Sequence, residues 1–167
     1  MKIIKLLLIF IVLLNLTGCN KYELDNKEIK NKIIIESINI DREYEIKSKT
    51  DDIKEITMFK ECGRPDIQNS NVVIGAHSGT GKYALFNNIN KLKKEDKIII
   101  YYNNKKYVYN VIAIKEVKDT EISILENNNQ SILTLLTCKI NDNSKRIVVI
   151  SVLEDNGKNW HVTKCQL

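Results

Sequence analysis

The stretch SILTLLTC, residues 131–138, decides the fold class, because seven apolar or β-favouring residues run without a break up to a cysteine. Such a run is typical of a mostly buried strand that delivers its last residue to a rim. After a polar loop over 139–145, Arg146 opens a second, strongly β-branched run over 147–153. Two strands joined by a loop of this length are expected to be neighbours, so Cys138 and Arg146 are predicted to face one groove.

Cys138 has the surroundings that a nucleophile needs. A nearby cation favours the thiolate, which is the reactive form of cysteine, and Arg146 would supply a charge that does not titrate in the useful range. An acid–base partner is also required, and His77 ends the apolar run over 72–76, whereas His161 lies in a polar tail without strand signals. His77 is therefore the predicted acid–base residue. The alternative for Cys138 is a buried, inert thiol at a strand end.

The order His77, then Thr-Leu-x-Thr-Cys ending at Cys138, then Arg146 closely resembles the sortase family of cysteine transpeptidases. The resemblance extends over roughly 33–153. It implies a mainly β fold, a closed barrel of about eight strands with short helices in the connections. It also implies that Cys138 is the nucleophile, that His77 is the general acid and base, and that Arg146 orients the substrate and stabilises the oxyanion.

The resemblance further implies a reaction and its partners. Cys138 would cleave a Thr–Gly-type bond in the C-terminal sorting signal of a secreted protein, and the thioester would pass to an amine of a cell-wall precursor or a pilin. Substrate contacts are expected at Thr137, Ala76 and Ser78, which flank the catalytic positions. No cofactor is implied. Nucleic acid is not an expected partner, because the net charge of +5 comes from dispersed rather than clustered lysines.

Residues 1–19 predict a targeting segment rather than part of the fold. Lys2 and Lys5 precede an unbroken apolar run over 6–14, which falls short of the ~20 residues that span a bilayer. The segment ends in Leu-Thr-Gly-Cys, which resembles a lipobox with Cys19 as the lipidated residue. An uncleaved signal anchor is the alternative, and both predict a catalytic domain tethered at the extracytoplasmic face of the bacterial membrane.

The remaining chain has the length of one domain with one core. We expect a tether over 20–31, a barrel over 32–155 and a tail over 156–167. The elements expected within the barrel are strands over 33–40, 44–46, 97–102 and 105–117, a helical turn or loop over 51–62, a short helix over 84–92, a hairpin turn at Asn103-Asn104 and a long connection over 118–130.

The remaining candidate ligands and thiols give weaker signals. Asp119, Glu121 and Glu126 in the long connection lack the spacing of a calcium loop, so no metal is predicted. Cys62 and Cys165 are able to pair in an oxidising compartment, but two free thiols are the favoured interpretation.

Two other functions compete with the transpeptidase hypothesis. One is a non-catalytic lipoprotein β-barrel that binds cell-wall or peptide ligands without turnover. The other is a papain-like peptidase, which would need a cysteine opening a helix and a histidine downstream of it. Here His77 precedes Cys138, and both are expected at strand ends, which disfavours the papain-like hypothesis.

Overall fold

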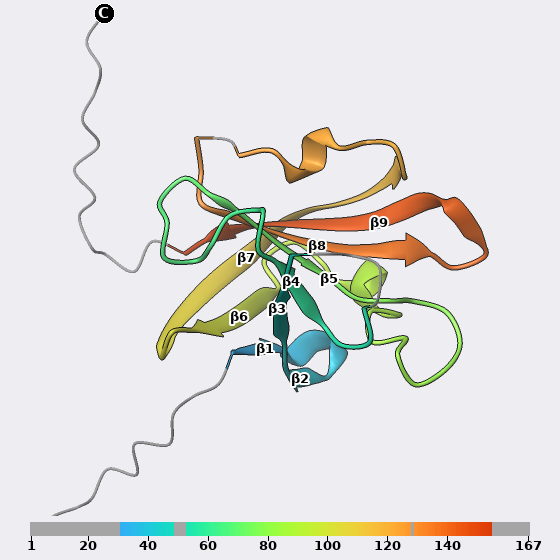
Figure 1. Cartoon of the computed structure of the whole chain (residues 1–167), viewed down its shortest axis with the longest axis horizontal. Coiled ribbons are helices and arrows are strands. Elements are labelled where there is room, and N and C mark those ends of the chain that lie inside the picture. Colours follow the sequence, from blue (N-terminus) through green and yellow to red (C-terminus); the bar gives the residue numbers. More distant parts are fainter. Residues whose placement is uncertain (1–30, 49–52, 128, 155–167) are drawn as a thin grey trace, which may run out of the picture.

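The computed structural model describes residues 31–48, 53–127 and 129–154, which form a nine-stranded sheet with three short 3-10 turns. The strands are β1 (Lys32–Ile35), β2 (Ile40–Glu43), β3 (Glu45–Lys47), β4 (Thr57–Phe59), β5 (Asn71–Gly75), β6 (Lys97–Tyr102), β7 (Lys105–Lys118), β8 (Ile132–Lys139) and β9 (Asp142–Leu153) (Figure 1). The turns are η1 (Glu36–Ile38), η2 (Ile89–Lys91) and η3 (Ser123–Leu125). The strand order is β2-β1-β6-β7-β9-β8-β5-β4-β3.

The two edges of this sheet are joined by a single residue. The edge strands β2 and β3 follow each other in the chain, with Tyr44 between them. The Tyr44 N–H donates to the Asn31 carbonyl beside β1 at 3.0 Å, and the Glu45 N–H donates to the Ile56 carbonyl beside β4 at 2.9 Å. One continuous segment therefore bonds to both ends of the sheet, which makes it a nearly closed barrel and confirms the predicted fold class.

The prediction of one continuous strand over 33–40 is wrong. The first strand ends at Ile35, and the chain turns through η1 and returns as β2 antiparallel to β1. Asn39 allows this reversal because it adopts a left-handed backbone with φ of 56°, a conformation that asparagine tolerates better than most residues. The split adds one strand, β2, to those expected, and β4 adds another.

Two helical predictions also differ from the structure. The described residues of 84–92 contain only the three-residue turn η2, and those of 51–62, where a helical turn or loop is predicted, contain loop and the three-residue strand β4. Asparagines at 87, 88 and 90 explain the first difference, since their side chains bond to nearby backbone in turns and disfavour a regular helix. The helices in the described part of the chain are too short and too polar for any of them to cross a membrane.

The hairpin turns determine where the functional strands end. Asn103 and Asn104 have φ of 49° and 59°, as predicted for a two-residue turn between β6 and β7. The predicted loop over 139–145 is wrong, because β8 runs to Lys139 and β9 begins at Asp142. Only two residues form this second turn, of which Asn141 is left-handed at 67°. The chain therefore reverses direction one residue after Cys138, in a tight turn from β8 to β9, and does not enter a loop.

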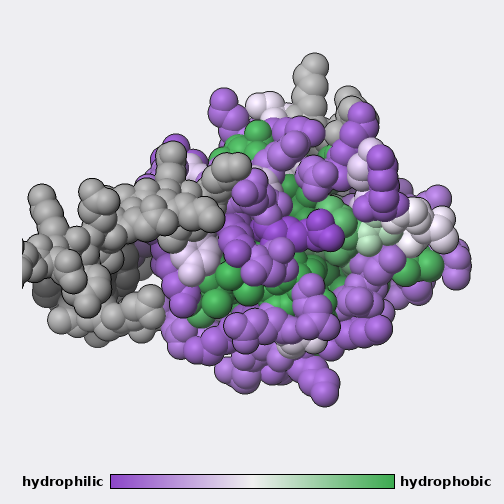
Figure 2. Space-filling model, turned by 90° about the horizontal axis from the view of Figure 1, so that it is seen from below, coloured by the Kyte–Doolittle hydropathy of each residue, from purple (hydrophilic) through white to green (hydrophobic). Residues whose placement is uncertain are grey.

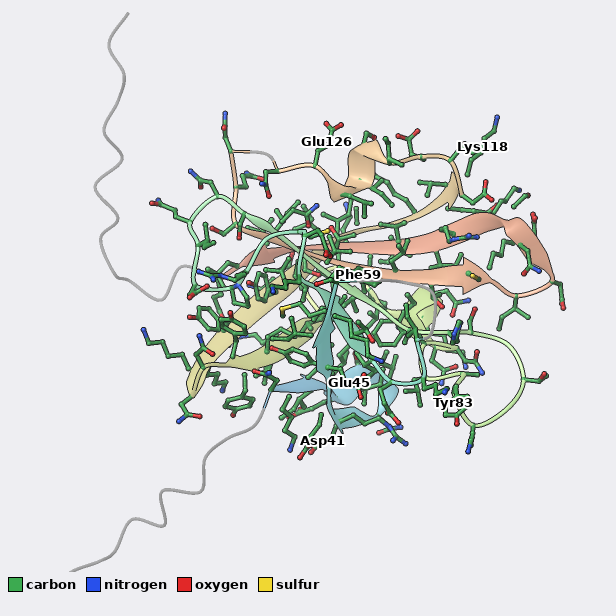
Figure 3. The ribbon with its side chains drawn as sticks, viewed as in Figure 1. Asp41, Glu45, Phe59, Tyr83, Lys118 and Glu126 are labelled. Carbon is green, nitrogen blue, oxygen red and sulfur yellow. The ribbon has the colours of Figure 1, made fainter. Side chains whose placement is uncertain are left out.

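Both faces of β5 and β8 are buried, which accounts for the unbroken apolar sequence of β8. Alternate residues such as Leu133 and Leu135 belong to the barrel core. Their neighbours Val73 and Thr134 are fully buried outside that core. Figure 1 shows the connection between β7 and β8, with its short turn η3, running above the sheet, and Figure 3 labels Lys118 at its start and Glu126 beside η3.

Asn71 fastens this connection to the barrel. Its side chain is fully buried and donates to the carbonyls of Ile124 at 2.8 Å and Glu126 at 3.2 Å. Its Oδ1 accepts from the Thr134 hydroxyl at 2.8 Å, and its backbone N–H donates to Asn127 Oδ1 at 2.7 Å. A buried polar group with all its partners fixes the elements around it, so the connection is held against β5 and β8.

Replacing Asn71 with alanine is expected to lower the free energy of unfolding by about 2–4 kcal/mol, because the buried Thr134 hydroxyl and two loop carbonyls lose their partner. Urea unfolding followed by fluorescence measures this. Asn88→Ala is the matched control, since Asn88 is exposed and its side chain makes no capping bond, and its effect should stay below about 0.5 kcal/mol. Equal unfolding midpoints for the two variants would contradict the role given to Asn71.

The predicted leader with Cys19 and the predicted tail with His161 and Cys165 lie outside the described residues, as does the tether before Asn31. Seen from below, on the side where Figure 1 shows β1 and β2, several apolar areas lie between hydrophilic residues (Figure 2).

Candidate active site

Three adjacent strands bring the predicted catalytic residues to one end of the barrel. The central strand β8 pairs in parallel with β5 and antiparallel with β9. Cys138 stands directly opposite Arg146 in the β8–β9 register, which confirms that these two residues are neighbours. On the other side, β5 pairs with β8 as far as Gly75, which lies opposite Leu136, and His77 follows two residues later. Cys138 therefore has Arg146 opposite it on β9, while His77 follows the end of β5, the neighbour of β8 on its other side.

Strand alternation gives the face on which the thiol lies. Leu133 and Leu135 point into the core, so Cys138 belongs to the opposite, outward set of side chains. Arg146 lies on the same face, since residues directly opposite in an antiparallel pair share a face. Cys138 and Arg146 are partly exposed and His77 is exposed. The three side chains are therefore accessible to a ligand outside the barrel.

The Arg146 guanidinium is held beside the β8–β9 turn. Its Nη1 donates to the carbonyls of Asn143 at 2.8 Å and Lys145 at 3.1 Å. Within the described residues, Nε and Nη2 of Arg146 have no acceptor. The planar, permanently charged guanidinium therefore retains N–H donors, and Arg146 lies on the same outward face of the sheet as Cys138.

The loop after His77 is fixed on its outer side. The His77 carbonyl accepts from the Phe86 N–H at 3.0 Å. The Asn87 side chain accepts from the Gly79 N–H at 2.7 Å and donates to the Gly79 carbonyl at 3.0 Å. Gly79 and Gly81 adopt φ of 117° and 103°, which side chains rarely tolerate, so the turn depends on both glycines. These contacts hold the backbone on both sides of Ser78, next to His77.

The predicted substrate-contact residues make contacts within the protein. Ala76 and Thr137 are buried, and the Thr137 hydroxyl donates to the Ala76 carbonyl at 2.8 Å. The Ser78 hydroxyl donates to the Cys138 carbonyl at 2.5 Å. Substrate contact by these three residues stays a prediction, whereas the bonds show that they connect the segments carrying His77 and Cys138.

A cavity of about 360 Å³ opens next to Cys138 at the same end of the barrel. Its lining includes Phe86, Ile89 and Ile147 on the apolar side, with Asn87 and Glu116 among its polar residues. Figure 1 shows the loop after β5, the end of β7 and the β8–β9 turn toward this one end of the molecule. A partly apolar cavity therefore lies beside Cys138, the candidate nucleophile.

Glu116 is a charged residue of this region that the sequence did not reveal. Its carboxylate pairs with Lys139 and with Lys145, each at 2.8 Å. The hydrogen bonds from Lys139 and then from Lys145 lower the pKa of Glu116 below its usual value. Glu116 lies on β7, and only the pairing of β7 with β9 brings it near Cys138, so no local sequence signal marks it.

The other candidate groups of the sequence do not form a site in the described structure. Among residues 31–48, 53–127 and 129–154, no three His, Cys, Asp or Glu side chains are grouped so as to hold a metal ion. Cys62 is a free thiol whose pKa is raised by burial and by the nearby Glu61 carboxylate. Its predicted alternative partner, Cys165, lies outside the described residues.

Comparisons with known proteins agree with one another. The sortase domain model matches residues 28–154. Sortase A of Bacillus anthracis is 33% identical over 129 residues, which are 75% of this chain and 60% of that protein. Sortase A of Listeria monocytogenes is 34% identical over 53% of this chain and 40% of that protein. The chain thus spans less than two thirds of both relatives. A crystal structure of Clostridium perfringens sortase C with its C-terminal cell wall sorting motif is 30% identical, with a TM-score of 0.67 over 74% of this chain and 69% of that one.

Proposed function

This chain belongs to the sortase family, and on that premise we propose that it is a cysteine transpeptidase in which Cys138, His77 and Arg146 carry the reaction. The observation that supports this assignment best is the strand arrangement, in which β8 holds Cys138 directly opposite Arg146 on β9 and next to the end of β5, where His77 follows. A nucleophile flanked by a proton carrier and a fixed cation is the arrangement that acyl transfer requires.

In the first half of the reaction, the Cys138 thiolate attacks the threonine carbonyl carbon of a Thr–Gly-type bond. The free N–H donors of Arg146 stabilise the oxyanion of the tetrahedral intermediate, where a fixed positive charge is most useful. His77 donates a proton to the departing amine, and collapse of the intermediate breaks the C–N bond. The products are a thioester on Cys138 and a released peptide with a new amino terminus.

In the second half, an acceptor amine attacks the thioester. His77 takes a proton from the incoming amine, a new amide bond forms, and the Cys138 thiolate is released. The substrate is the C-terminal sorting signal of a secreted protein, in keeping with the sorting motif seen in the Clostridium perfringens structure. The acceptor is an amine of a cell-wall precursor or a pilin subunit, and water in its place would make the same site a peptidase.

We further propose that the enzyme works at the extracytoplasmic face of the bacterial membrane. Residues 1–19 would provide the tether, either as a lipoprotein leader that ends at Cys19 or as an uncleaved anchor. Mass spectrometry of the amino-terminal peptide of the mature protein separates these two forms, because only the first has a diacylated Cys19 as its first residue.

A peptide-cleavage experiment tests the proposed function. The full-length chain in detergent is incubated with a set of sorting-signal peptides that vary around a Thr–Gly bond, with and without an added amine, and the products are identified by mass spectrometry. We expect cleavage after threonine in at least one peptide and a new amide product when the amine is present. A folded protein that binds peptides without cleaving any of them would instead support the non-catalytic binding module.

A further inference from the structure

Two hydroxyl groups bond the segment that carries His77 to the strand that carries Cys138. The backbone ladder between these segments ends with the Ala76 N–H donating to the Leu136 carbonyl at 3.3 Å. If the parallel β5–β8 pairing continued, the carbonyls of Ala76 and Cys138 would accept the next two hydrogen bonds from backbone N–H groups. In the structure these carbonyls accept from side chains instead, the first from Thr137 at 2.8 Å and the second from Ser78 at 2.5 Å.

These two bonds run in opposite directions and enclose the catalytic pair. Thr137 precedes Cys138 and bonds to the residue before His77, whereas Ser78 follows His77 and bonds to Cys138 itself. The contacts of Asn87 and Phe86 hold the outer side of the loop after His77 but do not reach β8. Beyond the last backbone rung, the described hydrogen bonds between the His77 segment and β8 come from these two hydroxyls.

We propose, on the basis of the proposed function, that Ser78 is a positioning residue that sets the distance and orientation between His77 and Cys138. Thr137 is buried and also contributes to packing, so its replacement would combine two effects. Ser78 is partly exposed, and its one described bond leads to the backbone of the nucleophile. The assignment differs from the substrate-contact role that the sequence suggests for Ser78, since the hydroxyl is already donated within the protein.

Loss of the hydrogen bond from Ser78 to the Cys138 carbonyl would impair proton transfer by His77 more than binding of the peptide substrate. Transfer between a histidine and a reacting group depends on hydrogen-bond distance, and displacements of about 1 Å cost as much as about 100-fold in rate. Ser78→Ala removes the hydroxyl without adding bulk, and Ser78→Thr retains a hydroxyl at the same carbon. Charged groups near the pair include Arg146, Lys145 and Asp142 on β9, Lys139 on β8 and Glu116 on β7, and all of them remain in each variant.

The test is the alkylation of Cys138 by iodoacetamide in the full-length chain between about pH 5 and 9, which includes the range of about pH 5 to 8 in which histidine changes charge. Peptide mass spectrometry assigns the adduct to Cys138 rather than to the other cysteines. Wild type is compared with His77→Ala, Ser78→Ala, Ser78→Thr and Thr80→Ala. Thr80 is the matched control, because its hydroxyl is exposed on the same turn and makes no bond among the described residues.

We expect His77→Ala to change the pH profile of Cys138 alkylation and Ser78→Ala to move that profile toward the His77→Ala curve. Ser78→Thr and Thr80→Ala should retain the wild-type curve, and the melting temperatures of all Ser78 and Thr80 variants should agree within about 3 °C. In the peptide assay, Ser78→Ala should lower kcat by about 10- to 100-fold with KM changed by less than about 3-fold.

A Ser78→Ala profile that superimposes on the wild-type profile would overturn the proposal, and so would profiles in which His77→Ala itself has no effect. The alkylation measurement uses no peptide substrate, so failure of the proposed function and failure of the positioning role give different results. A chain that cleaves no peptide but shows the expected alkylation profiles would disprove the transpeptidase assignment and leave the role of Ser78 supported.

Discussion

Replacing Cys138 with alanine is expected to abolish peptide cleavage and amide formation, with a loss of at least about 10⁴-fold in kcat/KM. The reason is that both halves of the proposed reaction pass through a bond to this sulfur, and no other group in the described site can form a thioester. The fold should be unaffected, because Cys138 is partly exposed and alanine adds no bulk. Product formation is measured by mass spectrometry, and folding by circular dichroism.

Cys62→Ala is the control for this substitution. Cys62 is the other described cysteine, but it follows β4, and burial raises the pKa of its thiol, which disfavours the reactive thiolate at neutral pH. This variant should cleave peptide at the wild-type rate. A Cys138→Ala protein with more than about a hundredth of wild-type activity would be incompatible with covalent catalysis by that sulfur.

Replacing Arg146 with alanine is expected to lower kcat/KM by about 10²- to 10³-fold, the usual cost of removing one oxyanion donor. Arg146→Lys restores the charge without the planar fork and should remain at least about 10-fold below wild type. Initial rates of peptide cleavage at several substrate concentrations give both values. A loss that appears mainly in kcat would indicate an interaction made in the transition state.

Arg42→Ala is the matched control for the arginine substitutions. Arg42 is an exposed residue of β2, at one edge of the sheet order, and carries the same charge away from Cys138. Its removal should leave the rate within about 2-fold of wild type. If Arg146→Lys cleaved peptide as fast as wild type, a point charge would suffice, and the geometric role of the guanidinium would be refuted.

The sequence predicts the strands around the site well, because the local signals there agree with one another. Residues 131–138 form a long apolar run, and the β-branched run after Arg146 can pair with it. Asn103 and Asn104 specify their own hairpin through a positive φ that asparagine accepts. The neighbouring positions of Cys138 and Arg146 follow from these elements, and the structure confirms that pairing.

The elements that sequence patterns miss depend on contacts between distant segments. The run over 33–40 is apolar enough for one strand, yet it breaks where Asn39 reverses the chain and β2 completes the barrel edge. Asn71 looks like any polar residue before a strand, and its buried role arises only when the β7–β8 connection folds over it. Ser78 likewise acquires its bond to Cys138 from the parallel pairing of β5 and β8.

The most direct test of the central claim, that Cys138 forms an acyl-enzyme, is intact-mass spectrometry of the full-length chain mixed with the cleaved sorting-signal peptide. We predict a mass increase equal to the amino-terminal part of the peptide, located on Cys138 and discharged by an added amine with formation of the amide. An adduct on another residue, or steady cleavage by Cys138→Ala protein, would contradict the account.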